Sequence, residues 1–159
     1  MPALYPRRLR LPTPLGVSLD IQADERGITA SRFVRAVPQR RARTPDPLLR
    51  EAAIQIRAYF AKRLRRFDLT LHIEGTAFQK RVWNLVAQLE TGEIISYGDL
   101  ARAVGAPRAA RGVAAAMART PFDLLIPAHR VVGSDGSVRG AGAGSMRRRL
   151  LRFEGITLR

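Results

Sequence analysis

Alternating apolar and polar residues near the N-terminus predict a β-hairpin. The stretch PLGVSLDIQADERGITASRFVR alternates on both sides of the segment Ala23–Gly27. A period of two is typical of half-buried strands, and a short polar segment between two such runs is typical of a turn. We therefore expect an antiparallel pair of strands on either side of residues 23–27.

A helix and one more strand are predicted to follow the hairpin. After an exposed, proline-containing loop over residues 36–47, apolar residues recur at helical spacing from Leu48 to Phe67. This spacing predicts an amphipathic helix with an arginine-rich outer face. The alternation in DLTLHI, residues 68–73, then predicts a strand, so residues 1–74 form a small α/β domain.

From Gly75 onward the pattern changes to short helices. Thr76 is a candidate N-cap for a helix over residues 77–90 that Gly92 ends. Ser96 is a candidate N-cap for a second helix, which Gly105 stops. Pro107 then opens a third helix over residues 108–118. The second and third helices, joined by a tight turn, form a helix-turn-helix pattern within a second domain, residues 75–159.

The last of these helices carries very few large side chains. Its sequence RAARGVAAAMA contains one glycine and six alanines between arginines. A surface of this kind packs closely against a neighbouring helix or enters a groove in a partner. Because Arg108, Arg111 and Arg119 flank the small residues and Arg102 lies on the preceding helix, we favour a nucleic-acid groove.

The charge of the chain agrees with a polyanionic partner. The formal net charge is +15, with 28 Lys and Arg against 13 Asp and Glu in 159 residues. From residue 94 onward there are eleven arginines and four acidic residues. A cationic excess of this size favours nucleic acid, although an arginine-rich composition also occurs in proteins that bind none.

Several function classes lack support. The chain has no cysteine, which excludes disulfides, thiolate metal sites and a thiol nucleophile. His72 and His129 are the two histidines, and neither has metal-ligand spacing, so we expect no metal and no cofactor. No apolar run approaches the roughly 18 residues of a membrane span. We therefore expect a cytoplasmic, nucleoid-associated monomer.

The segment LLIPAHRVVGSDG, residues 124–136, resembles a reaction centre. Pro127, His129 and Arg130 are crowded where an apolar run enters a turn. His129 and Glu154 can form a carboxylate–histidine pair that would activate a neighbouring nucleophile. However, Ala128 between the proline and the histidine has no reactive group, and the nearby serines occur in glycine-rich turns without a nucleophile motif.

Residues 75–132, GTAFQKRVWNLVAQLETGEIISYGDLARAVGAPRAARGVAAAMARTPFDLLIPAHRVV, resemble the C-terminal domain of the O6-alkylguanine-DNA alkyltransferases. The tail RRRLLRFEG is similar to the closing helix of that family. The resemblance implies an α+β fold, with a small N-terminal α/β (ribonuclease H-like) domain. A mostly helical C-terminal domain with a winged-helix-like helix-turn-helix would follow.

The resemblance implies a role for each matching residue. Ala128 stands where the family has its reactive cysteine, His129 matches the histidine that deprotonates the thiol through water, and Glu154 matches the carboxylate that orients it. Arg111 matches the arginine that fills the gap left by an extruded nucleotide. The implied minor-groove contacts are Tyr97, at the target phosphate, with Arg108, Ala109, Ala110, Arg111, Gly112 and Ala115.

The implied base pocket consists of Pro127, Ala128, Thr120, Val131 and Ala141, and it departs from the family at three positions. Besides Ala128, Thr120 replaces an asparagine that braces the turn, and Gly140 or Ala141 replaces a pocket tyrosine. Alkyl transfer by the family mechanism requires a thiolate. This pattern resembles the alkyltransferase-like proteins, which bind O6-alkylguanine, flip it and hand it to nucleotide excision repair.

We therefore expect a DNA-damage sensor without a catalytic residue, whose partners are duplex DNA containing O6-alkylguanine and excision-repair proteins. Three alternatives stay open. The chain could be an engineered Cys→Ala form of an active methyltransferase. It could be an enzyme that uses a water held by His129 and Glu154. Or it could be an architectural minor-groove binder with equal affinity for damaged and undamaged duplex.

Overall fold

A computed structural model describes residues 7–36, 43–139 and 141–158, without the side chains of residues 141–145. The chain forms two compact units. The first unit comprises Met1–Ile73 and Pro121–Leu125, and the second comprises Glu74–Thr120 and Ile126–Arg159. No helix in the described ranges is long and apolar enough to cross a bilayer.

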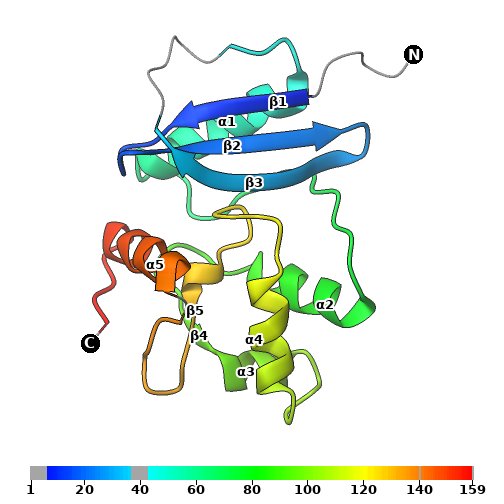
Figure 1. Ribbon diagram of the computed structural model, residues 1–159, viewed down its shortest axis with the longest axis vertical. Coiled ribbons are helices and arrows are strands. Elements are labelled where there is room, and N and C mark those ends of the chain that lie inside the picture. Colours follow the sequence, from blue (N-terminus) through cyan, green and yellow to red (C-terminus); the bar gives the residue numbers. More distant parts are fainter. Residues whose placement is uncertain (1–6, 37–42, 140, 159) are drawn as a thin grey trace. The chain divides into compact units, whose positions relative to one another are not determined.

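The first unit is an antiparallel three-stranded sheet with one helix packed on one face (Figure 1). Alternation places apolar side chains such as Leu9, Leu11 and Leu19 in the core with Leu49 and Ile56 of the helix. The strands lie in the order β1-β2-β3. The elements are β1 (Arg7–Pro12), β2 (Val17–Asp24), β3 (Gly27–Arg35) and α1 (Pro47–Phe60).

The predicted hairpin is confirmed, with Asp24 paired to Gly27 at its end. The Asp24 carboxylate accepts the backbone N–H groups of Arg26, at 2.7 Å, and of Gly27, at 3.1 Å. A Cβ on Gly27 would lie 2.7 Å from the carbonyl oxygen of Thr70. Glycine is therefore required here, because residues 70–72 pass directly beside this end of the hairpin.

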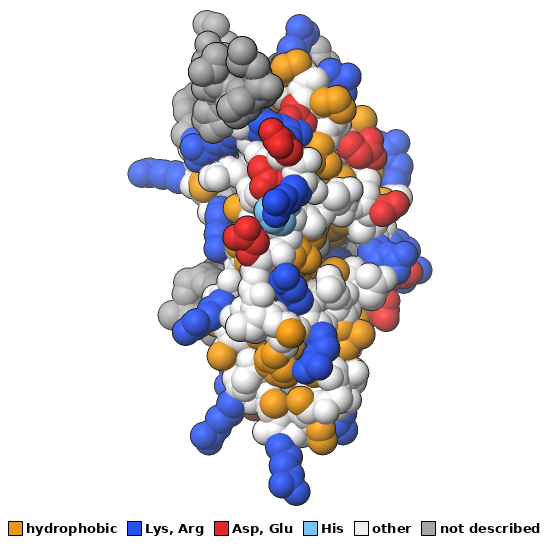
Figure 2. All heavy atoms as spheres, turned by 90° about the vertical axis from the view of Figure 1, so that its right-hand side faces the viewer, with side chains coloured by type: hydrophobic (Ala, Val, Ile, Leu, Met, Phe, Trp, Pro, Cys, Tyr) orange, Lys and Arg blue, Asp and Glu red, His pale blue; other side chains and the backbone are white. Residues whose placement is uncertain are grey.

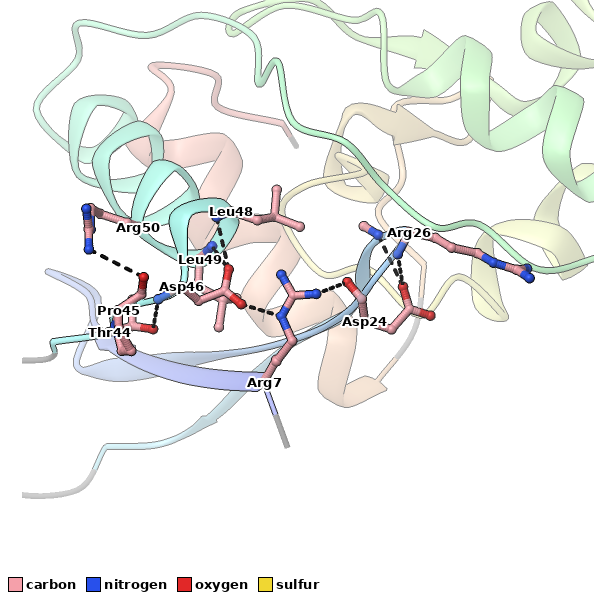
Figure 3. Close-up of polar contacts among 10 residues, drawn as sticks. Arg7, Asp24, Arg26, Thr44, Pro45, Asp46, Leu48, Leu49 and Arg50 are labelled. Atoms are coloured by element: carbon pink, nitrogen blue, oxygen red, sulfur yellow. Dashed lines mark hydrogen bonds and ion pairs between the residues drawn. The ribbon is translucent and has the colours of Figure 1, made fainter. Parts of the chain in front are cut away.

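Arg7 connects β1 to the end of β2 and to the start of α1, as Figure 3 shows. Its guanidinium donates to the Asp46 carboxylate and to the backbone carbonyl of Asp24. Asp46 is also the N-cap of α1 and accepts the backbone N–H groups of Leu48 and Leu49 at 2.9 and 3.1 Å. One carboxylate therefore both caps the helix and fixes the first strand, which the sequence analysis did not predict.

Two predicted elements of this unit are shorter than expected. Helix α1 ends at Phe60 instead of Phe67. The chain reverses at Lys62, whose φ of 60° lies in the left-handed region, and a lysine there gives no sequence signal for a helix end. The strand predicted over residues 68–73 is also shorter than expected: it consists of a single β-bridge between Leu71 and Ile28.

A segment far along the chain completes the sheet edge at β3. The Ser31 N–H donates to the Pro121 carbonyl at 3.0 Å, and the Asp123 N–H donates to the Ser31 carbonyl at 2.7 Å. The Ser31 hydroxyl donates to the Asp123 carbonyl at 2.6 Å. This segment, Pro121–Leu125, therefore belongs to the first unit by its contacts, although it leads directly into the turn that contains Ala128.

The second unit is mostly helical (Figure 1). Thr76 forms the predicted N-cap as part of a capping box with Gln79, and Ser96 caps the next helix by accepting the Asp99 N–H at 3.0 Å. The elements are α2 (Ala77–Val86), β4 (Ile95–Ser96), α3 (Tyr97–Ala103), α4 (Ala110–Ala118), the 3₁₀ turn η1 (Ala128–Arg130), β5 (Val131–Val132) and α5 (Ala141–Phe153).

Helices α3 and α4 form the predicted helix-turn-helix, but two boundaries differ. Helix α2 ends at Val86 instead of residue 90, and α4 begins at Ala110 because the Ala109 N–H still closes a turn onto Ala106. Trp83 fixes α4 in place, since its indole N–H donates to the Ala116 carbonyl at 2.9 Å. The buried side of α4 consists of Val113, Ala116 and Met117.

Candidate nucleic-acid interface

The turn that contains Ala128 is tightly held at both ends. The Ala128 N–H donates to the Ile126 carbonyl at 2.8 Å, and the Arg130 N–H donates to the Pro127 carbonyl at 3.0 Å. The turn continues into β5, which pairs in parallel with β4 through Val131 and Ile95. The backbone of η1 is therefore ordered by hydrogen bonds that do not involve the side chain at position 128.

His129 and Glu154 form the predicted pair. The Nε2 atom of His129 contacts Oε2 of Glu154, and their side chains are 1% and 0% exposed. Helix α5 ends at Phe153 and therefore places Glu154 directly beside η1. The sequence predicted this pair correctly although 25 residues separate its members.

Arg130 forms a second ion pair with Glu154, which was not predicted from the sequence. Its Nε donates to Oε1 of Glu154 at 2.8 Å and its Nη2 to Oε2 at 3.1 Å. The same guanidinium donates to the Leu89 carbonyl at 2.6 Å and contacts the Thr91 hydroxyl at 3.2 Å. Arg130 is 2% exposed, so it contributes to the internal network and not to the basic surface.

The pKa values define the charge state of this network. Burial lowers the pKa of His129 below 6.5 and outweighs the hydrogen bond to Glu154. Burial would raise the pKa of Glu154, but hydrogen bonds and charges from His129 and Arg130 lower it to about 2. At neutral pH a neutral His129 therefore donates from Nε2 to an ionised Glu154, and its Nδ1 carries the lone pair.

His129 can accept a proton, but the Ala128 side chain has no acidic proton to donate. A neutral imidazole with a fixed tautomer is a general base for a thiol or a water. Ala128 is half-buried at the start of η1 and carries a methyl group where a nucleophile would be required. Within the described ranges, no cluster of three His, Asp or Glu side chains could hold a metal ion.

Three residues of the predicted base pocket, Pro127, Ala128 and Val131, lie in or directly beside this turn. Pro127 precedes η1 and is buried, Val131 follows it and is fully buried, and Thr120 is 6% exposed. Ala141 is the first residue of α5, and its side chain lies outside the described part of the structure, as does Gly140 entirely. That these residues line a pocket for a base stays a prediction.

Most of the predicted DNA contacts lie on the outer side of α4 and the turn before it. Arg108, Arg111, Gly112 and Ala115 are exposed, whereas Ala109 and Ala110 are half-buried. In the view of Figure 2, the lower part, where Figure 1 places α3 and α4, shows Lys, Arg and apolar side chains and almost no acidic ones. This composition suits a phosphate-lined groove.

Gly112 has no structural requirement for being a glycine. A Cβ at this position would lie 3.6 Å from the Phe78 ring and 3.8 Å from Cβ of Ala109, which are ordinary contacts. An exposed glycine inside a helix costs about 1 kcal/mol relative to alanine. The fold therefore gives no reason for this glycine, whereas the close approach of a partner to α4 would.

Tyr97 differs from the other predicted DNA contacts because it is 6% exposed. Its hydroxyl lies 3.3 Å from Nη1 of Arg147, and the guanidinium of Arg139 lies 5.5 Å from the centroid of its ring. Tyr97 was predicted from the sequence as a site residue, whereas neither arginine was. No motif signals them, since they approach Tyr97 from a loop and a helix more than 40 residues away.

Comparisons with known proteins agree with this geometry. A family model described as "6-O-methylguanine DNA methyltransferase, DNA binding domain" matches residues 77–156. The methylated-DNA--protein-cysteine methyltransferase of Methanosarcina acetivorans is 37% identical over 150 residues, which cover 90% of this chain and 94% of the relative. The protein of the same name from Mycobacterium bovis is 44% identical over 115 residues, 72% of this chain and 70% of the relative.

Solved structures give the same result for both units. The O6-methylguanine methyltransferase of Mycobacterium tuberculosis has a TM-score of 0.77 at 35% identity, covering 91% of this chain and 90% of that one. The M. tuberculosis OGT in complex with DNA has a TM-score of 0.77 at 37% identity, covering 92% and 91%. The chain therefore belongs to the O6-methylguanine DNA methyltransferase family, although its own sequence contains no cysteine.

Proposed function

We propose that this protein is a non-enzymatic sensor that binds O6-alkylguanine in duplex DNA through the minor groove and holds the flipped base beside Ala128. The observation that carries the proposal is the combination of Ala128 with an intact His129–Glu154 pair in a chain without cysteine. The general base is retained, and the acceptor for the alkyl group is absent.

The basic face of α4 supports the DNA-binding half of the proposal. Arg108 and Arg111 are exposed at the start of the helix, where no side chain caps the free N–H groups. Phosphates bind readily at such positions because the free N–H groups carry partial positive charge and the arginines carry full positive charge. Arg111 would then fill the gap in the base stack, and Gly112 and Ala115 would let α4 approach the groove.

Base flipping supplies part of the proposed selectivity. Extruding a base costs a few kcal/mol, and the cost is smallest where the base pair is already weakened. Alkylation at O6 removes the N1–H donor of guanine and weakens its pairing with cytosine. Because Ala128 is small, the space beside it would accept bulky alkyl groups, and the bound lesion would then be passed to excision-repair proteins.

A competitive binding measurement tests the sensor function. Duplexes with O6-methylguanine and with guanine at the same position should be compared at 150 mM and 300 mM salt, because charge alone produces strong binding to both at low salt. We expect the O6-methylguanine duplex to bind at least tenfold tighter at both salt concentrations. Equal affinities would indicate an architectural minor-groove binder and would overturn the proposal.

Mass spectrometry after incubation with the lesion separates sensing from repair. The native chain should gain no methyl mass, and the DNA should retain O6-methylguanine. The Ala128→Cys variant is the matched control, because the His129–Glu154 pair is in place to deprotonate a thiol at this position. Transfer to the native chain, or guanine restored with turnover, would contradict the sensor function.

A further inference from the structure

Two arginines converge on the buried Tyr97. Arg147 contacts the phenol oxygen through Nη1 at 3.3 Å, and its Nη1 also lies 3.5 Å from the Arg139 carbonyl oxygen. The guanidinium of Arg139 lies over the face of the same ring, 5.5 Å from its centroid. The backbone of Arg139 is therefore tied to Arg147, and both cations meet at one side chain.

This cationic cluster has no carboxylate of its own. Among the described residues, neither Arg139 nor Arg147 forms an ion pair with an acidic side chain. The pKa of Asp135 is lowered mainly by hydrogen bonds from Ser137 and least by the charge of Arg139. Two guanidiniums beside one buried phenol repel each other, so binding an anion between them is favourable.

The cluster lies beside the turn that contains Ala128. Tyr97 directly follows β4, whose Ser96 pairs with Val132, four residues after Ala128. Helix α5, which carries Arg147, packs against η1. The charge of Arg147 also contributes to the lowered pKa of His129, as expected for a cation close to that ring. Arg147 is half-buried, unlike the exposed Arg111 of α4.

We propose that Tyr97, Arg139 and Arg147 form an anion subsite that favours guanine adducts whose O6 substituent ends in a carboxylate, such as O6-carboxymethylguanine. This inference rests on the proposed sensor function, since the base must enter beside Ala128. A planar guanidinium pairs with a carboxylate through two hydrogen bonds, and the Tyr97 hydroxyl supplies a third donor. A backbone phosphate is the other anion that could reach this subsite, and the experiment below distinguishes the two.

Four duplexes test the subsite by fluorescence anisotropy. They carry O6-carboxymethylguanine, its uncharged amide O6-carbamoylmethylguanine, O6-methylguanine, or guanine at one position. The carboxylate and the amide have nearly the same shape, so their affinity ratio reports charge recognition. We expect the native chain to bind the carboxylate duplex roughly tenfold tighter than the amide duplex, because hydrogen bonds to charged groups are about twice as strong.

Three variants locate this preference in the chain. In Arg139→Gln and Arg147→Gln the carboxylate-to-amide ratio should fall toward one. Arg148→Gln is the matched control, since it removes the same charge from the adjacent, exposed position of α5 and should leave the ratio unchanged. Thermal unfolding of each variant verifies the fold, and Arg139→Gln alters an exposed side chain that the core does not require.

Two results would overturn the inference. One is an equal affinity of the native chain for the carboxylate and amide duplexes. The other is a uniform loss across all four duplexes with a shallower salt dependence in Arg139→Gln and Arg147→Gln, which would show that these arginines bind a backbone phosphate. Failure of the sensor function is a separate result, because it appears as equal affinity for O6-methylguanine and guanine.

Discussion

The network around Glu154 and the outer face of α4 are opposite kinds of site. The Glu154 side chain is fully buried and accepts hydrogen bonds from His129 and from two nitrogens of Arg130, and Arg130 in turn donates to the Leu89 carbonyl. On α4, Arg111 and Gly112 are exposed, and the packing of the fold does not require a glycine at position 112. The contacts of the first site stabilise the fold, whereas the exposed residues of the second site are explained only by binding to a partner.

This difference determines how each site should be interpreted. The His129–Glu154 pair matches a catalytic network, but Arg130 uses the same carboxylate to connect η1 to the segment after α2. Removing Glu154 would therefore destabilise the fold even without any chemistry at residue 128. A retained catalytic pair is weak evidence for activity here, whereas exposed arginines beside an unneeded glycine are stronger evidence for a binding partner.

The largest effect is expected from Glu154→Gln. This variant leaves Arg130 buried without a compensating charge, which typically costs 3–5 kcal/mol, a rough estimate for breaking a buried ion pair. Urea unfolding at pH 7 measures the loss. Asp99→Asn is the control, because it breaks the exposed pair with Arg102 on α3 and should change stability little. Similar losses in both variants would mean that burial does not distinguish the Glu154 network.

Arg111→Ala should have the next largest effect, on binding only. If Arg111 fills the gap that the flipped base leaves in the base stack, its loss should reduce the preference for O6-methylguanine over guanine by about tenfold, which corresponds to about 1.4 kcal/mol. Arg119→Ala removes the same charge at the other end of α4, where Arg119 is also exposed. It should weaken binding to both duplexes equally. The same pattern in Arg111→Ala would contradict the assigned role.

Gly112→Ala should have opposite effects on stability and on binding. The added Cβ meets ordinary contacts only, so the variant should be more stable by about 0.5–1 kcal/mol. Affinity for duplex DNA should nevertheless fall, because the methyl group stands on the face that approaches the groove. Thermal unfolding and anisotropy on the same sample measure both changes. Unchanged affinity would remove Gly112 from the DNA-binding face.

The smallest effect is expected in the pH dependence of stability. The pKa of His129 is below 6.5 in the folded state, so the unfolded chain binds more protons and stability falls as the pH drops through 6.5. Glu154 acts in the same direction at lower pH, from 4.5 down to about 2. His129→Gln should remove the decrease between pH 7.5 and 5.5. An unchanged slope in this variant would assign the decrease to other groups.

Periodicity and capping residues predicted the elements whose causes are local in the chain. The hairpin at Asp24–Gly27 and the caps at Thr76 and Ser96 are examples. Strand β1 was not predicted, although Leu9 and Leu11 alternate with arginine residues. The edge contact between Ser31 and Pro121 could not be predicted, since such backbone hydrogen bonds carry no residue-specific signal.

For the candidate site, the family pattern predicted residues by position but not their surroundings. His129 and Glu154 were paired correctly, and the exposed positions of α4 agree with a binding face. Arg130 was predicted at the candidate reaction centre, but its burial and its ion pair with Glu154 were not predicted. The sequence therefore indicated which residue types are present, and only the structure showed which of their charges face inward.

The sequence alone determined that no thiol is available, that Ala128 stands between Pro127 and His129, and that residues 108–118 carry small residues between arginines. These properties follow from side-chain chemistry and its order along the chain. Tertiary structure decided that Glu154 is shared between His129 and Arg130 and that Arg139 and Arg147 meet at Tyr97. Burial and charge pairing depend on contacts between distant segments, which only the folded chain brings together.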